Sequence, residues 1–152
     1  RIRKYNLKQL KMSTTKTVIS KEIALTEIET LINRFVKKPV RFDEIEETYP
    51  DILDAIMDGY LSFNKETGIP VLKLKYPVKN VQGDNTLSEI TFKTRIKPTT
   101  LRNLAKGIDL KKDPMGLQLK MVAHITDQLE SMIDNYEVYD LDVIQQLSAI
   151  FS

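Results

Sequence analysis

The sequence predicts an α+β fold, mainly helical, in which a small antiparallel β-hairpin or meander packs on helices. Apolar residues recur at helical spacing before residue 60 and again after residue 113. Between these stretches, apolar and polar residues alternate with a period of two, as they do in strands with one buried face. The helices are therefore expected at both ends of the chain and the strands in its middle.

Residues 20–36 are expected to form an amphipathic helix that ends before Pro39. Ser20 is a residue type that caps helices, and Thr26 with Glu29 forms the pattern of a capping box one turn further in. Five apolar residues make up its stripe: Ala24, Ile28, Leu31, Ile32 and Phe35. This stripe predicts contact with the core or with a partner.

A second helix is expected from Pro50, because proline suits the first position of a helix, to about Gly59. The acidic stretch before it, "FDEIEETYP", is interpreted as solvated chain. The next stretch predicts a short strand, a turn at Asn64–Gly68 and a longer strand. Strict alternation would place Leu72, Leu74 and Tyr76 on one face of the longer strand, and Val71, Lys73 and Lys75 on the other.

A third strand is expected at Ile90–Ile96, after a turn at Gly83. Pro98 then begins a short helix that closes at Gly107. Further helices are expected at Asp113-Pro114, in "ESMIDNY", and after a capping Asp140. The inner face of the helix after Pro114 is expected to comprise Met115, Leu119, Val122 and Ile125.

The composition is that of an ordinary soluble domain, with 41% hydrophobic and 29% charged residues in 152. The absence of cysteine excludes disulfides and thiolate zinc sites. No apolar run approaches the length of a membrane span, so the sequence predicts no membrane partner and a cytosolic protein. Five basic residues and no acidic one occur in residues 1–11, which we interpret as an upstream or vector-derived leader; a nucleic-acid-binding arm is the alternative.

The sequence offers no set of residues for catalysis, a cofactor or a metal. His124 is the only histidine, and it lies in an expected helix without a second histidine or any cysteine to assist it. The five glycines form no phosphate-binding pattern, and the acidic residues match no calcium loop. We therefore expect a protein that is not an enzyme and that binds no cofactor.

Basic residues on the two longer strands suggest one other function. Under strict alternation a single face would carry Lys73, Lys75, Lys93, Arg95 and Lys97. Such a face could bind nucleic acid, but no aromatic residues alternate with the lysines to stack on bases. Lysines also keep an edge strand from pairing with other chains, and this is the simpler interpretation.

The order of motifs after residue 70 resembles the phage tail assembly chaperones of long-tailed phages and related prophages. The matching positions are Leu74–Pro77, Leu87–Ile96, Pro98–Leu104, Ile125-Thr126, Ile133-Asp134, Tyr136 and Asp140-Leu141. Two positions depart from the family pattern. Asp127-Gln128 replaces a glycine, an apolar residue and a proline, which predicts a less defined end of the helix, or none, at this point. Tyr136 replaces a leucine.

The resemblance implies a chaperone-like domain at 70–152, preceded by a helical extension at 20–69 and a disordered leader at 1–19. It also implies a protein of the host cytoplasm that keeps the tape measure protein soluble, helps recruit tail tube subunits and is absent from the mature virion. Whether several copies associate stays open. The alternatives are a structural tail component, such as a completion or connector protein, and a small nucleic-acid-binding module.

Two apolar stripes are candidates for binding the partner, although core packing is the more usual role of such stripes. They comprise Leu141, Ile144, Leu147 and Phe151 in the last helix, and Ile28, Leu31, Ile32 and Phe35 in the first. Either stripe could receive an amphipathic helix of the tape measure protein.

Overall fold

A computed structural model describes residues 19–38 and 40–152 of the chain. The described residues form seven α-helices and one three-stranded antiparallel sheet, which confirms the predicted α+β fold class. The helices are α2 (Lys21–Phe35), α3 (Ile45–Thr48), α4 (Pro50–Met57), α5 (Pro98–Ala105), α6 (Pro114–Thr126), α7 (Glu130–Ile133) and α8 (Val138–Phe151). The strands are β1 (Leu61–Phe63), β2 (Pro70–Lys79) and β3 (Asn85–Thr91), and a 3-10 turn, η1, spans Phe42–Glu44.

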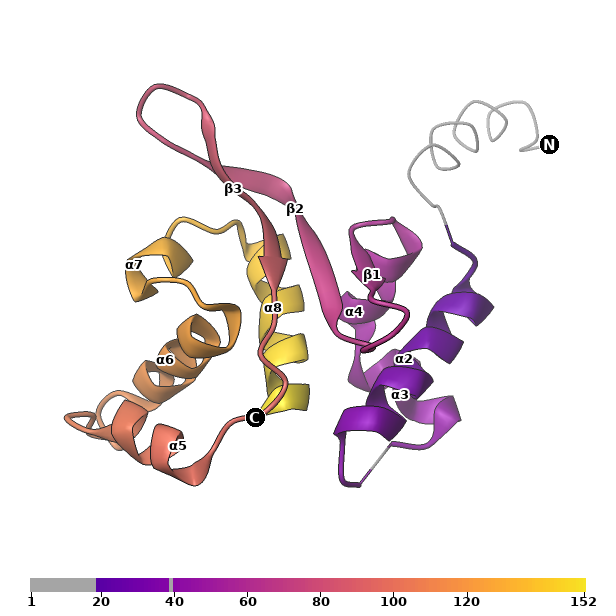
Figure 1. Ribbon diagram of the computed structural model, residues 1–152, viewed down its shortest axis with the longest axis horizontal. Coiled ribbons are helices and arrows are strands. Elements are labelled where there is room, and N and C mark those ends of the chain that lie inside the picture. The colour runs from indigo at the N-terminus through magenta and orange to yellow at the C-terminus, as the bar shows by residue number, and fades with distance from the viewer. Residues whose placement is uncertain (1–18, 39) are drawn as a thin grey trace.

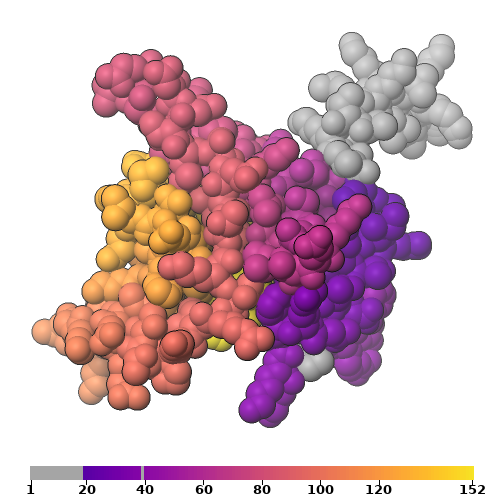
Figure 2. Space-filling model, viewed as in Figure 1, coloured from indigo at the N-terminus to yellow at the C-terminus, as the bar shows by residue number. Residues whose placement is uncertain are grey.

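The sheet lies across α8, with α2–α4 on one side and α5–α7 on the other (Figure 1). The strands follow each other in the order β1-β2-β3, as a meander does. Beyond the helices, the β2–β3 hairpin projects from the body of the molecule (Figures 1 and 2). Helix α8 lies between the two groups of helices and contacts α4, α6, α2 and β2. It is the element around which the others pack.

A single buried cluster joins the two parts that the sequence separates at residue 70. It contains Ile28 of α2 and Ile52 of α4 together with Ile125 of α6 and Ile144 of α8, all at most 1% exposed. The boundary at residue 70 falls inside the sheet, because Phe63 of β1 pairs with Pro70 of β2.

The predicted leader lies outside the described residues, except for its last residue. Ile19 packs against the core, and its backbone N–H donates to the carbonyl of Met57 at 3.3 Å. The leader predicted for residues 1–19 is therefore wrong at this one position. Ile19 instead connects the start of α2 to the end of α4.

The predicted helix ends are partly confirmed. Ser20 caps α2 by accepting the Ile23 N–H at 3.4 Å, but Thr26 lies inside the helix and donates to the Glu22 carbonyl at 2.9 Å, so the capping box is wrong. The acidic stretch before α4 was predicted to be solvated chain. Seven of its nine residues are exposed, as expected, but the stretch also forms η1 and α3, and Ile45 is fully buried.

The N-terminus of α4 is capped from the other end of the chain. Pro50 opens this helix as predicted, but Tyr49 before it makes no side-chain cap. The side chain of Gln146 in α8 accepts the N–H groups of Asp51 and Ile52, both at 3.1 Å, and donates to the Asp51 carboxylate at 2.7 Å. These bonds satisfy two of the free amides at a helix start and tie α4 to α8.

A large irregularity interrupts the pairing of β2 with β3. Lys73 lies opposite Glu89, but the next pair is Val78 with Leu87, so residues 74–77 of β2 face Ser88 alone. The prediction of strict alternation along this strand is wrong from this point. Tyr76, which was expected on the apolar face, is 48% exposed.

Asp140 stabilises this irregularity from α8. Its carboxylate accepts the N–H of Lys75 at 2.9 Å and that of Tyr76 at 3.0 Å, and the residue is 1% exposed. The sequence suggested Asp140 as a helix cap, which is wrong, because α8 already begins at Val138. The side chain instead supplies acceptors to two N–H groups of β2 that have no hydrogen-bond partner on β3.

The third strand ends earlier than expected. β3 spans Asn85–Thr91, whereas the sequence predicted a strand through Ile96. The alternation continues without a sheet partner: Phe92 is 5% exposed, and the N–H of Lys93 donates to the Ile125 carbonyl of α6 at 2.7 Å. The segment 92–97 thus runs from the sheet to α5 as extended chain.

Candidate partner-binding surface

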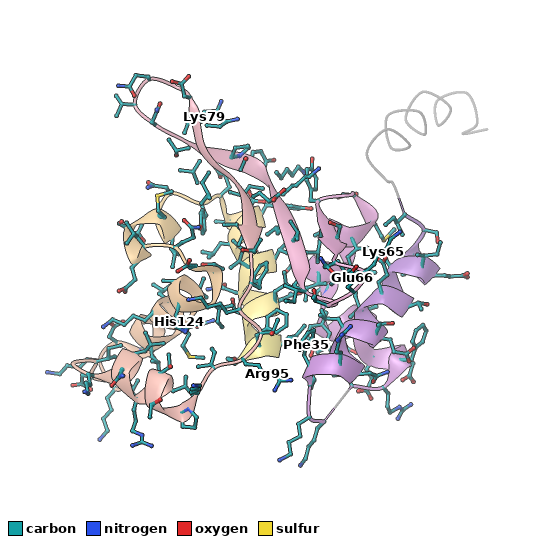
Figure 3. The ribbon with its side chains drawn as sticks, viewed as in Figure 1. Phe35, Lys65, Glu66, Lys79, Arg95 and His124 are labelled. Carbon is teal, nitrogen blue, oxygen red and sulfur yellow. The ribbon has the colours of Figure 1, made fainter. Side chains whose placement is uncertain are left out.

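The two stripes that the sequence proposed for partner binding are core. Of their eight residues, Phe35 and Leu141 are partly buried and the other six are at most 5% exposed: Ile28, Leu31, Ile32, Ile144, Leu147 and Phe151. Phe35 projects from α2 toward α8, where its ring meets that of Phe151 edge to face at 5.1 Å between centroids (Figure 3). The stripes face the shared core, so neither offers an open groove to a partner in this structure.

Another apolar surface lies in a segment that the two candidate stripes do not include. No residue from 93 to 121 is buried, although eight large apolar side chains lie within residues 98–121. These are Leu101, Leu104, Ile108, Leu110, Met115, Leu117, Leu119 and Met121. Leu119 alone among them packs against the buried core of the described chain. We call residues 98–121 the α5–α6 lobe.

Local geometry explains why the lobe stands apart from the core. Proline opens both of its helices, and α5 ends after two turns near Gly107, which has a left-handed φ of 78°. The connecting loop is closed by Asp109, whose carboxylate accepts the N–H groups of Lys111 at 3.0 Å and Lys112 at 3.4 Å. Helix α5 is short and contributes no buried residue, and the buried residues of α6 all lie in its second half, from Val122 on.

A groove of about 260 Å³ separates the lobe from α8. Its walls are the first turns of α6 and the last turns of α8, with Leu110 at its edge. The lining residues are Leu110, Pro114, Leu117, Gln118, Met121, Val122, Gln145, Ser148, Ala149 and Ser152. None of these side chains carries a charge, and six of the ten are apolar. We call this hollow the α6–α8 groove.

One polar group in the groove has no partner among the described residues. Ser148 is 5% exposed, and its hydroxyl makes no hydrogen bond. A buried hydroxyl without a partner costs free energy. The hydroxyl oxygen of Ser148 is enclosed by the chain itself, so we assign it no part in binding.

Two other hollows lie on the surface. One, of about 370 Å³, adjoins His124 on α6, Lys120 and Asp127; His124 itself is partly exposed (Figure 3). The other, of about 270 Å³, lies between α2 and the turn after β1. There the carboxylate of Glu27 has one buried oxygen without a partner, and burial raises its pKa.

Within residues 19–38 and 40–152, no three histidine or acidic side chains come together in a way that would hold a metal ion. The described helices also include none with the length and apolar character needed to cross a bilayer. His124 lies near Lys120 and Asp127, at a hollow open to solvent, and its imidazole makes no hydrogen bond or ion pair with a described residue.

The basic strand face is less continuous than the sequence suggested. Lys75 lies over the ring of Tyr139, 4.5 Å from its centroid, and Lys93 pairs with Asp127 at 3.6 Å. Arg95 and Lys97 follow the end of β3 and belong to the extended chain that leads to α5 (Figure 3). The five basic residues therefore do not form one row on paired strands.

The break after α6 is sharper than the departure from the family pattern suggested. Asp127 adopts a left-handed conformation with φ of 55°, and its N–H bonds to the carbonyls of Ala123 and His124. The N–H of Gln128 closes the same turn onto Ala123 at 2.9 Å. Aspartate can take the left-handed position that glycine usually fills at a helix end.

Comparison with known proteins adds no relative. Neither the protein-family models, nor the curated protein sequences, nor the solved structures contain a match to this chain.

The sequence reasoning missed the lobe for a physical reason. Met115 and Leu119 were expected on the inner face of their helix, but Met115 is 55% exposed. Helical spacing shows that side chains share one face, yet it does not show whether that face is covered. A signal was present in α5, because a proline-opened helix of only eight residues brings few apolar residues to a core.

Proposed function

We propose that this protein binds and holds an apolar helical segment of another polypeptide, as a tail assembly chaperone of a long-tailed phage or prophage. The resemblance over residues 70–152 supplies the identity of the client, which is the tape measure protein. The tail tube protein is the second partner that the resemblance implies. The protein would act in the host cytoplasm and be absent from the finished particle.

The α5–α6 lobe is the observation that carries this proposal. Leu110 and Met115 are more than half exposed, and the other six apolar side chains of the lobe are partly exposed. Covering the exposed half of a leucine or methionine contributes up to about 1 kcal/mol. Exposed apolar patches of this kind mark surfaces that bind other proteins. A client whose helices present repeated apolar stripes would gain the same contribution.

The side chains of the lobe suit binding better than catalysis. They are hydrocarbons, amides, hydroxyls, five basic groups and two aspartates, with no cysteine or histidine among them. The side chain of the neighbouring His124 makes no hydrogen bond or ion pair with a described acidic side chain. A reaction would need a nucleophile with a base to activate it, and we propose that this protein is not an enzyme.

Co-expression with the tape measure protein tests the proposal. We expect the chain to raise the soluble yield of the client and to co-purify with it. Leu110→Gln should abolish most of this effect, whereas Ile23→Gln on α2 is a matched control, because both residues are 56% exposed in the free chain.

An unchanged yield of soluble client would refute the chaperone function. If the chain were instead found in fixed ratio in purified particles, it would be a structural tail component. Salt-sensitive binding of DNA or RNA in place of the client would favour the nucleic-acid module.

A further inference from the structure

The α6–α8 groove has features that specify its occupant more closely than the proposed function does. It is walled by two helices and lined by uncharged side chains, and the exposed pair Lys111 and Lys112 directly follows its lining residue Leu110 in the chain. We propose that it receives an amphipathic α-helix whose apolar stripe is flanked by acidic residues. This inference rests on the proposed function and names the chemistry of the client segment.

The lining of the groove favours a helix over an extended strand. A strand placed there would expose backbone N–H and C=O groups that need partners. The backbone groups of α6 and α8 are paired within their helices, except for the first N–H groups of α6 and the last carbonyls of α8. The lining adds four polar side chains: Gln118, Gln145, Ser148 and Ser152. A helix satisfies its own backbone, so it can present apolar side chains to such a surface.

The size of the groove suits the same occupant. A volume of about 260 Å³ accommodates a few apolar side chains, which is what one face of a helix offers over two or three turns. The exposed side chains of Leu110 and Met115 extend the apolar surface beyond the groove.

The charges around the groove favour an acidic flank. The lobe carries five basic side chains against two acidic ones, a net charge of +3. Both aspartates lie in local turns: Asp109 accepts backbone amides, and Asp113 lies so close to Gly116 that an added Cβ there would clash with it. Lys111 and Lys112 form no ion pair with any described residue.

These charges would contribute more to the specificity of binding than to its affinity. Exposed ion pairs contribute little to affinity, and they weaken further in salt, but like charges placed opposite each other disfavour the wrong partner. The apolar stripe would therefore supply the affinity and the acidic flank the preference. We expect a preference of about tenfold at low ionic strength.

Two synthetic helical peptides test the inference with the full-length chain. Both carry the same leucine and methionine stripe at i, i+3, i+4 and i+7, and they differ only in flanking residues, which are glutamate in one and lysine in the other. Fluorescence anisotropy of a labelled peptide should show tighter binding of the glutamate peptide. The double variant Lys111→Glu/Lys112→Glu should reverse this preference.

The double variant Lys37→Glu/Lys38→Glu is the matched control, because it reverses two adjacent exposed lysines that lie after α2, away from the groove. It should leave the preference unchanged. Ala149→Phe places a large side chain in the groove from an exposed position of α8, and it should reduce binding of the glutamate peptide more than tenfold.

Equal binding of the two peptides, or a preference that survives reversal of Lys111 and Lys112, would overturn the inference. So would binding that Ala149→Phe leaves intact, because the occupant would then lie outside the groove. In each case the co-expression result would still decide the chaperone function separately. Loss of client solubilisation would refute the function, whereas loss of the peptide preference would refute only the acidic helix.

Discussion

Tyr136 is a buried residue whose hydroxyl makes no hydrogen bond with a described residue. It is 8% exposed, and burial raises its pKa to about 12. Removing an unsatisfied buried hydroxyl while keeping the ring is expected to be neutral or stabilising. We predict that Tyr136→Phe raises the free energy of unfolding by about 1 kcal/mol, measured by urea denaturation at pH 7.

The control is Tyr76→Phe, which removes a hydroxyl from a ring that is 48% exposed and should change stability little. A loss of stability in Tyr136→Phe, with Tyr76→Phe unchanged, would show that the buried hydroxyl has a partner after all. The leucine that the resemblance places at this position also lacks a hydroxyl, which agrees with an apolar environment.

Protonation of Asp51 should stabilise the folded chain at acid pH, whereas protonation of most carboxylates destabilises it. Its pKa is raised above the ordinary 3.8 by partial burial, then by the charges of Asp142 and Asp54. The folded chain therefore holds this proton more tightly than the unfolded chain does. Its contribution to stability consequently improves as pH falls from the raised pKa through the ordinary value.

We predict that Asp142→Asn removes one of these charges and lowers the pKa of Asp51 toward its ordinary value. The variant should be more stable than the parent at pH 7, by about 0.5 kcal/mol, because the repulsion between partly exposed carboxylates is modest. Thermal unfolding should show this gain at pH 7 and its disappearance near pH 3. A gain that persists at pH 3 would assign it to another cause.

At the scale of elements, Asp140 should be the side chain on which the sheet depends most. Its carboxylate accepts two backbone N–H groups of β2 at the point where β2 is not paired with β3. An asparagine side chain has one acceptor oxygen, and its NH2 group would face the second N–H group, so that two donors would meet. We predict that Asp140→Asn lowers the free energy of unfolding by about 2–3 kcal/mol. Urea denaturation measures the loss.

Hydrogen exchange gives the same prediction a local test, because the amides of Lys75 and Tyr76 should lose protection in the variant. Asp134→Asn, at an exposed position just before α8, is the control and should leave both measurements unchanged. Retained protection at these two amides would mean that another group satisfies them.

Local signals predicted most elements because they act over a few residues. Ser20, Pro50 and Pro114 each mark a helix start that the structure confirms. The features that sequence reasoning missed depend on residues far apart in the chain. Gln146 caps a helix 94 positions away, and Asp140 reaches a strand 64 positions away, so neither follows from local spacing.

At the scale of the molecule, charge is divided between two regions. The lobe is basic, whereas the segment 40–58 carries one basic and seven acidic residues. Composition predicted none of this, because opposite charges cancel in the total of +2. Apolar spacing identified the faces of the helices, but which of these faces are covered depends on how α2, α6 and α8 pack.

The central claim is that the α5–α6 lobe and the end of α8 hold a helix of another polypeptide. Amide hydrogen exchange of the chain, alone and co-purified with the tape measure protein, tests it most directly. We predict added protection in residues 98–121 and 145–152 on complex formation, with α2 unchanged. Protection confined to other elements, or absent everywhere, would contradict the claim.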